Sequence, residues 1–289
     1  MSIFKLEKHS GLDFKKAVLF MIISTFSFAL MNVSVKYLDR IPSFQIVFFR
    51  CLGSFLLATS YILIKGIPIL GNKRKLMVLR AVIGLTAMTL YFLSLKHLPV
   101  GTAVSLRYIA PIFAAIFAIF ILKEKLKNIQ WLFFVVAFAG VLVLKGFDSN
   151  INTTGLSLIL IASVFSGMVY VVLRKIAKSD HPAVVVNYFM FVGTVIGGLL
   201  AISVWVQPKG VEWIFLLLLG LFGFMGQLYM TRAFQIAQTN LVAPLKYIEV
   251  IFTMSIGVIW FNEVYTFYSF LGLIMIIVAL VLNTMVKKD

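Results

Sequence analysis

The chain has 289 residues, of which 62% are hydrophobic and 12% are charged, and its mean hydropathy is +1.05. A water-soluble globule of this length needs more polar surface than this composition supplies, which argues against a soluble enzyme. The excess of 26 Lys and Arg over 10 Asp and Glu would suggest nucleic-acid binding in a soluble protein. Here the basic residues lie in short loops between apolar segments, which is a pattern of membrane topology, so no nucleic-acid partner is expected.

Ten apolar segments follow one another along the chain. A helix needs about 20 apolar residues to cross the hydrocarbon core of a bilayer. Segments close to this length lie at 17–35, 43–64, 76–95, 100–122, 129–144, 154–173, 183–206, 213–231, 240–261 and 265–285, of which the fifth is the shortest. The connections are too short to hold a separate soluble domain, so the sequence predicts an all-α membrane protein of ten transmembrane helices.

The basic residues are distributed unevenly between the two sides of these spans. If the N-terminus is cytoplasmic, 17 of the 26 Lys and Arg fall in inside segments and five in outside loops. Cytoplasmic loops carry an excess of Lys and Arg, so this distribution predicts that both termini are cytoplasmic. The remaining four basic residues lie within spans and are Arg50, Arg80, Arg107 and Lys246.

The second half of the chain repeats the first at an offset of 139 residues. This offset places Arg107-Tyr108-Ile109 on Lys246-Tyr247-Ile248 and Glu124 on Glu263 without a gap. We therefore predict two five-helix repeats, at 17–144 and 154–285. Because five is odd, the second repeat enters the membrane inverted, an architecture typical of alternating-access transporters with a substrate site between the halves. The alternative is that the duplication reflects ancestry only.

Ionisable side chains inside a span require a partner or a water-filled cavity, because their insertion costs about 2.5 to 3.5 kcal/mol at the bilayer centre. Arg50 and Arg107 each lie roughly 10 Å from the outer end of their spans, so both can line one outward-facing cavity. Arg80 lies only about 6 Å from the inner end of its span. There it is either a cavity residue or a long side chain that reaches the headgroups.

Lys246 and Glu249 lie three residues apart in the ninth predicted span and would share one helix face. They form either a local ion pair that permits the burial of both charges or a group that binds substrate or a proton. Glu249 is the one carboxylate well inside a predicted span, which makes it the candidate for proton coupling.

The expected cavity holds more cations than anions, which favours a substrate with a carboxylate or phosphate, such as an amino acid, organic acid or zwitterion. Polar side chains that can orient such a substrate are those of Asn32, Tyr91, Tyr108, Gln227 and Tyr247, and each is equally compatible with plain packing. Pro111 is interior to its span and is expected to kink it just past Arg107. The sequence contains no phosphate-binding loop and no acid–base or metal-ligand constellation, so we expect no cofactor, no metal and no membrane-embedded enzyme.

The chain resembles the drug/metabolite transporter superfamily, EamA type. The resemblance rests on residues 95–103 (Leu-Lys-His-Leu-Pro-Val-Gly-Thr-Ala), on Arg107 and Pro111, on the terminal Glu124, and on the inverted copy that ends at Glu263. The chain departs from the family where Gly usually precedes the terminal Glu, because Lys123 and Asn262 stand there instead.

The resemblance implies ten helices, cytoplasmic termini and secondary transport of a small metabolite, often export of amino acids or their derivatives. The expected partners are the lipid bilayer of a bacterial cytoplasmic membrane and a small-molecule substrate, and the expected state is a monomer or weak homodimer. Phe48-Phe49-Arg50 and Leu79-Arg80 also resemble members that carry S-adenosylmethionine, so uptake or exchange of such a compound is an alternative. A facilitator without energetic coupling is a further alternative, and the role of Glu249 separates it from a coupled carrier.

Overall fold

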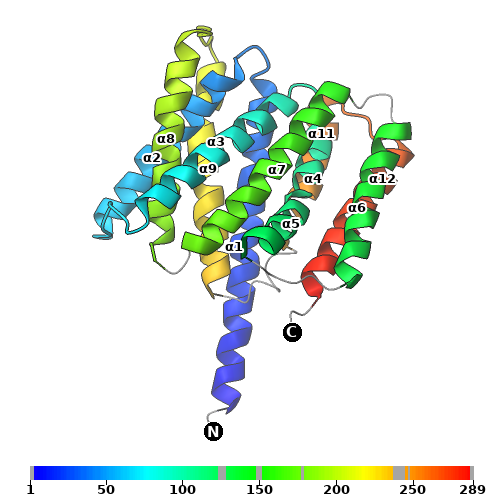
Figure 1. Cartoon of the computed structure of the whole chain (residues 1–289). Coiled ribbons are helices and arrows are strands. Elements are labelled where there is room, and N and C mark those ends of the chain that lie inside the picture. Colours follow the sequence, from blue (N-terminus) through cyan, green and yellow to red (C-terminus); the bar gives the residue numbers. More distant parts are fainter. Residues whose placement is uncertain are drawn as a thin grey trace.

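The computed structural model describes residues 3–122, 128–147, 152–176, 179–236, 245–246 and 248–286, and every long regular element in these residues is a helix. Figure 1 shows the helices as one bundle in which α1 begins and α12 ends at the same end, which we call the termini end. The helices are α1 (Ile3–Tyr37), α2 (Ser43–Ile64), α3 (Arg74–Ser94), α4 (Val100–Arg107), α5 (Ala110–Leu122), α6 (Asn128–Phe147), α7 (Thr153–Ile176), α8 (Pro182–Ile202), α9 (Glu212–Ile236), α11 (Ile248–Phe261) and α12 (Phe267–Met285).

The helices account for the ten predicted spans. Seven segments are long and apolar enough to cross a membrane, one of them formed by α4 and α5 together, and three shorter apolar helices lie at Asn128–Val143, Ile248–Phe261 and Phe267–Asn283. The prediction of an all-α protein with ten spans is therefore confirmed.

The predicted bounds of the seventh and the ninth span differ from those of their helices. The seventh span was expected to reach residue 206, but α8 ends at Ile202. Beyond it, the amide of Gln45 holds Val206, because its Nε2 donates to the carbonyl of Val206 at 2.9 Å and its Oε1 accepts from the N–H at 3.0 Å. The ninth span was expected to begin at 240, but α11 begins at Ile248, and residues 237–244 lie outside the described part of the chain.

The fourth span is broken at its centre. Helix α4 ends at Arg107 and α5 starts at Ala110, and the N–H groups of Tyr108 and Ile109 bond to carbonyls three residues back, at 3.1 Å each. Pro111 has no N–H and cannot close the helical bond to the carbonyl of Arg107. The helix is thus interrupted where a kink was expected from Pro111, and the interruption places Arg107 beside non-helical backbone in the interior of the bundle.

The two repeats interlock instead of standing side by side. Helix α1 packs against α9 and α3 against α7, while α2 packs against α8 and α6 against α12. The 139-residue offset maps α1 on α7 and α3 on α9, so the first two contacts are copies of each other and the last two join each helix to its own copy. Figure 1 shows α6 and α12 together at one edge of the bundle. This symmetry agrees with the two inverted repeats; the exact bounds 17–144 and 154–285 stay a prediction.

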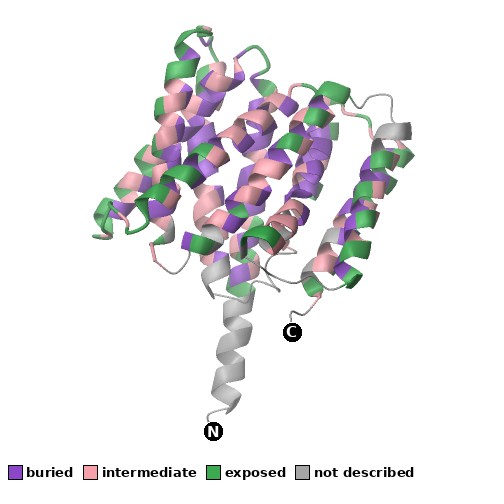
Figure 2. Ribbon diagram, viewed as in Figure 1, coloured by how far each residue is buried: buried purple, intermediate pink, exposed green. Residues whose placement is uncertain are grey.

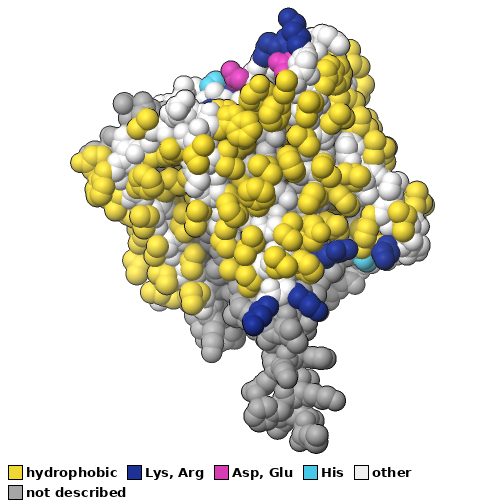
Figure 3. Space-filling model, turned by 180° about the vertical axis from the view of Figure 1, so that it is seen from behind, with side chains coloured by type: hydrophobic (Ala, Val, Ile, Leu, Met, Phe, Trp, Pro, Cys, Tyr) yellow, Lys and Arg dark blue, Asp and Glu magenta, His cyan; other side chains and the backbone are white. Residues whose placement is uncertain are grey.

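The outer surface of the bundle is apolar. Large hydrophobic side chains such as Leu217, Ile259 and Phe267 are exposed, whereas polar residues such as Asn32, Ser105 and Thr253 are buried. Figure 2 shows buried residues concentrated along the inner faces of the helices, and Figure 3 shows hydrophobic side chains over most of one face, with Lys and Arg toward its two ends. This arrangement suits a solvent of lipid, because the exposed apolar band meets the acyl chains and helices satisfy their own backbone hydrogen bonds.

Candidate functional site

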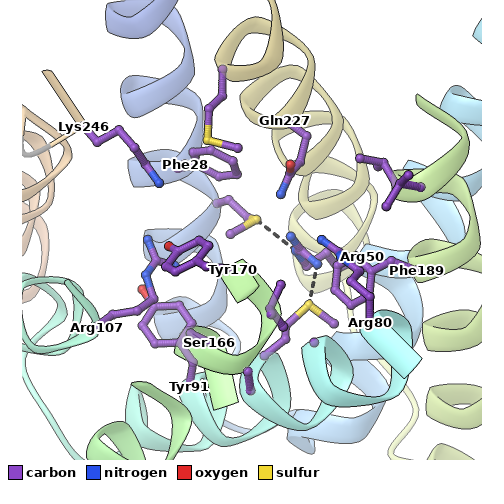
Figure 4. Close-up of a pocket in the computed structure, with 18 of the residues that line it drawn as sticks. Phe28, Arg50, Arg80, Tyr91, Arg107, Ser166, Tyr170, Phe189, Gln227 and Lys246 are labelled. Carbon is purple, nitrogen blue, oxygen red and sulfur yellow. Dashed lines mark hydrogen bonds between the residues drawn. The ribbon is translucent and has the colours of Figure 1, made fainter. Parts of the chain in front are cut away.

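A cavity of about 400 Å³ lies between the two repeats. Its walls come from α1 to α4 of the first repeat and from α7 to α9 and α11 of the second (Figure 4). The lining continues to Ile176, where α7 ends, and to Asp180 in the connection that follows. The cavity therefore extends from the middle of the bundle toward the termini end, and not toward the opposite end as expected for Arg50 and Arg107.

Contacts between the repeats hold the opposite end together. The carboxylate of Glu263 accepts hydrogen bonds from the N–H of Val100, with its two oxygens at 2.9 and 3.1 Å, and so caps the N-terminus of α4. The hydroxyl of Tyr265 donates to Glu263 at 2.6 Å and accepts from the N–H of Gly101 at 3.2 Å. These bonds join the residues after α11 in the second repeat to the start of α4 in the first, at the end of the bundle opposite the termini end.

Asp180 lies at the rim of the cavity and ties two connections together. Its carboxylate accepts from the N–H groups of Asn72 and Lys73, the latter at 3.1 Å, and from the hydroxyl of Ser179 at 3.0 Å. Partial desolvation acts to raise the pKa of Asp180, but these hydrogen bonds outweigh it, so the pKa lies below its usual value. The side chain is therefore ionised at neutral pH.

Arg50 places a guanidinium in the cavity and forms no ion pair with any carboxylate in the part of the chain that the structure describes. The residue is 5% exposed, and its Nε lies 3.2 Å from the sulfur of Met31, while Nη1 contacts the sulfur of Met88. Figure 4 shows these two contacts as dashed lines. A thioether is a weak acceptor, so it compensates little of the charge.

Arg80 also lines the cavity and has fewer partners still. Only 8% of the residue is exposed, and its guanidinium stacks on the ring of Phe189 at 4.2 Å. Its Nε and Nη1 are buried and have no hydrogen-bond partner within the described residues. Of the two roles that the sequence left open, the structure favours the cavity residue, because the cavity itself extends down to this depth.

Arg107, by contrast, is neutralised by the protein. Its Nη2 donates to Oε1 of Glu249 at 2.8 Å, and the side chains are 25% and 1% exposed, respectively. The same carboxylate accepts from Nδ2 of Asn32 at 2.9 Å and from the hydroxyl of Tyr108 at 2.7 Å. This network joins α4 of one repeat to α11 of the other, with α1 as a third member.

The expectation that Lys246 and Glu249 share a helix face is wrong, because α11 begins at Ile248 and Lys246 precedes it. The ion pair of Glu249 is made with Arg107, while the ammonium of Lys246 lies 5.8 Å from the ring centre of Tyr108. The prediction from helix periodicity failed because it assumed one continuous helix through Lys246 and Glu249.

The remaining predicted residues divide into three groups. Gln227 and Tyr91 line the cavity, and the buried hydroxyl of Tyr91 has no hydrogen-bond partner among the described residues. Asn32 does not line the cavity but holds Glu249 from α1. Tyr247 lies outside the described residues.

Comparison with known proteins assigns the family. The model of the EamA-like transporter family matches residues 15–145 and 153–285. The chain belongs to the EamA-like transporter family. This membership confirms the resemblance to the drug/metabolite transporters and the expectation that the chain is not an enzyme.

Several curated relatives of this EamA-like transporter carry transport functions in their names. The pseudopaline exporter CntI of Pseudomonas aeruginosa (strain UCBPP-PA14) is 29% identical over 280 residues, which cover 95% of this chain and 98% of the exporter. Human solute carrier family 35 member G1 is 28% identical over 277 residues, covering 89% and 76%. The S-adenosylmethionine uptake transporter of Rickettsia prowazekii (strain Madrid E) is 29% identical over 245 residues, covering 84% and 83%.

A solved crystal structure shares the fold of the EamA-like transporter. It aligns with a TM-score of 0.68 at 18% sequence identity and covers 92% of this chain and 94% of that one. This likeness shows the fold. Membership of the family and the transporter relatives show that the chain is a multi-pass membrane transporter.

Proposed function

We propose that the chain is a secondary transporter, an exporter or exchanger, of a small anionic or zwitterionic metabolite such as an amino acid or its derivative. The observation that carries this proposal is the guanidinium of Arg50, which is buried in the cavity between the repeats and whose hydrogen-bond acceptors among the described residues are two thioether sulfurs. Midplane cavities between inverted repeats are where secondary transporters bind their substrates.

The energetics of a buried cation support an anionic group in the substrate. Removing a charge from water costs several kcal/mol unless a partner compensates it. A carboxylate that enters the cavity supplies this partner and can accept two parallel hydrogen bonds from one guanidinium. Binding energy is then available to the substrate because the protein has not already used this cation in an ion pair of its own.

Glu249 is the proposed coupling residue. Its pair with Arg107 bridges the two repeats, which move against each other in alternating access. A carboxylate that loses its cation inside the membrane favours the protonated form, since the charged form is the one that burial penalises. Separation of α4 and α11 would break the pair of Glu249 with Arg107, so this pair is where coupling to the state of the carrier is proposed.

Two alternatives to this function remain, and a specific observation supports the first. S-adenosylmethionine uptake transporters of Rickettsia are among the relatives, which supports uptake or exchange of such a compound. An uncoupled facilitator is supported if the pair of Glu249 with Arg107 serves structure alone. The bacterial relatives support a location in a bacterial cytoplasmic membrane, and the basic-residue distribution supports an orientation with both termini in the cytoplasm. We propose a monomer or weak homodimer there.

The substrate is identified by untargeted metabolomics of a deletion strain against an overexpressing strain, inside the cell and in the medium. We expect an anionic or zwitterionic metabolite to change in opposite directions in the two strains. Arg50→Gln should abolish the effect of overexpression, whereas Arg74→Gln should retain it, because Arg74 is exposed at the start of α3 and outside the cavity lining. A purely cationic metabolite, or a fully active Arg50→Gln variant, would contradict the proposal.

Coupling is tested separately in everted vesicles with an imposed pH gradient. Uptake of the identified metabolite should follow the gradient in the wild type and become independent of it in Glu249→Gln. If uptake in the wild type ignores the gradient and Glu249→Gln transports equally well, the carrier is an uncoupled facilitator.

A further inference from the structure

The three arginines that line the cavity are not equivalent. Among the described residues, the ion pairs are those of Arg40 with Glu212 and of Arg107 with Glu249. Arg50 and Arg80 belong to neither, although both are more than nine-tenths buried. The protein thus neutralises one of its three cavity arginines and leaves two.

The two unneutralised guanidinium groups lie on the same wall of the cavity. Figure 4 shows Arg50 and Arg80 beside Phe189, with Arg107 and Tyr91 on the other side. Arg80 is six residues from the start of α3 and Arg50 is 14 residues from the end of α2, so their backbones lie roughly 9 and 21 Å from the termini end. Arg80 therefore lies nearer the rim of the cavity, and Arg50 lies nearer its centre.

An anionic group bound to Arg50 alone leaves the charge of Arg80 uncompensated. Burial penalises the guanidinium of Arg80, and the like charge of Arg50 acts on it in the same direction. A single carboxylate on Arg50 would leave Nε and Nη1 of Arg80 buried without an acceptor. Unsatisfied buried donors on a charged group are more costly than those on a neutral one.

We propose that Arg80 and Arg50 form a two-point anion site and that the transported metabolite carries two anionic groups, as a dicarboxylate or a phosphorylated carboxylate does. This inference rests on the proposed function and narrows its substrate class. The ring of Phe92 lies 5.8 Å from the guanidinium of Arg50 and that of Phe189 lies 4.2 Å from the guanidinium of Arg80, so both rings are placed to contact the carbon skeleton between the anionic groups. A volume of about 400 Å³ is at the small end of ligand pockets, which suits a compact metabolite.

An exchange assay tests the charge of the substrate before the substrate itself is identified. Purified protein is placed in liposomes filled with an unlabelled metabolite extract of bacteria, and these are transferred into the same extract labelled with ¹³C. Label that enters the lumen, measured by mass spectrometry against protein-free liposomes, identifies transported metabolites whether the carrier is coupled, uncoupled or an exchanger. We expect the labelled metabolites to carry two or more anionic groups at neutral pH.

Variants of α3 then assign the second anionic group to Arg80. Arg80→Gln should slow the exchange of these metabolites by about tenfold to a hundredfold, as expected for loss of a hydrogen-bonded charge pair. Arg74→Gln, on the same helix but outside the cavity lining, should exchange at the wild-type rate. Arg80→Lys keeps the charge without the planar fork and should be intermediate, which also carries the test if Arg80→Gln does not fold.

The outcomes separate this inference from the proposed function. Exchange only of metabolites with a single anionic group, or an Arg80→Gln variant as fast as Arg74→Gln, would overturn the two-point site and leave an anion transporter in place. Entry of no label above the protein-free control would overturn the proposed function itself.

Discussion

The substitution Glu249→Gln removes the charge that neutralises Arg107 and retains the shape of the side chain. Glu249 is 1% exposed and accepts from Arg107, Asn32 and Tyr108 at 2.7 to 2.9 Å. Removal of one partner of a buried ion pair is worth about 3 to 5 kcal/mol. We expect about 3 kcal/mol here, because Arg107 is one-quarter exposed to the cavity and the amide oxygen can still accept a hydrogen bond.

Thermal unfolding of the purified protein in detergent measures this effect. At about 2 to 4 °C per kcal/mol, the Tm of Glu249→Gln should fall by about 6 to 12 °C. Arg107→Gln should fall similarly, and the double variant should lose less than the sum of the two, because the second substitution removes a charge that is already unpaired. Arg40→Gln breaks an exposed ion pair and should melt close to the wild type. Additive losses in the double variant, or a Tm of Glu249→Gln equal to that of Arg40→Gln, would refute the reasoning.

Three further predictions concern the packing and the two ends of the bundle. Gly53→Ala should destabilise the protein by about 1 to 3 kcal/mol in the same melting assay. The new Cβ would lie 2.8 Å from the Cα of Gly220, and a backbone atom cannot move aside as the end of a side chain can. An unchanged Tm would disprove this close approach. Glu263→Gln should cost about 1 kcal/mol, since it removes the charge that caps the N–H of Val100 at the start of α4, and a Tm lowered by about 2 to 4 °C would show it. The pKa of Asp180 is lower in the folded protein than in the unfolded chain. The ionised side chain therefore contributes to stability at any pH above the ordinary carboxyl pKa, and this contribution is lost as the pH falls through the lowered pKa of the folded protein. The Tm difference between wild type and Asp180→Asn should therefore be constant from pH 8 to 5 and shrink only below about pH 4, whereas a difference that shrinks near pH 6 would contradict it.

The sequence by itself determined the membrane class, the ten spans, the duplication and the break at Pro111. These features depend on properties that are local in the chain. The length of an apolar segment follows from the thickness of the bilayer, and a missing N–H breaks a helix wherever it occurs in the interior. The end of a span was mispredicted where a contact with another helix determines it. The seventh span was expected to reach Val206, which instead bonds to Gln45 of α2.

Only the tertiary structure decided which charges meet. Periodicity paired Lys246 with Glu249, yet the carboxylate bonds to Arg107, 142 residues earlier in the chain. The depth of Arg80 near a span end was compatible with contact to headgroups, and only the packing of α3 against α8 shows that its guanidinium faces Phe189 in a cavity. The free energy of a buried charge depends on what surrounds it in three dimensions, and the spacing of residues along a single helix does not contain that information.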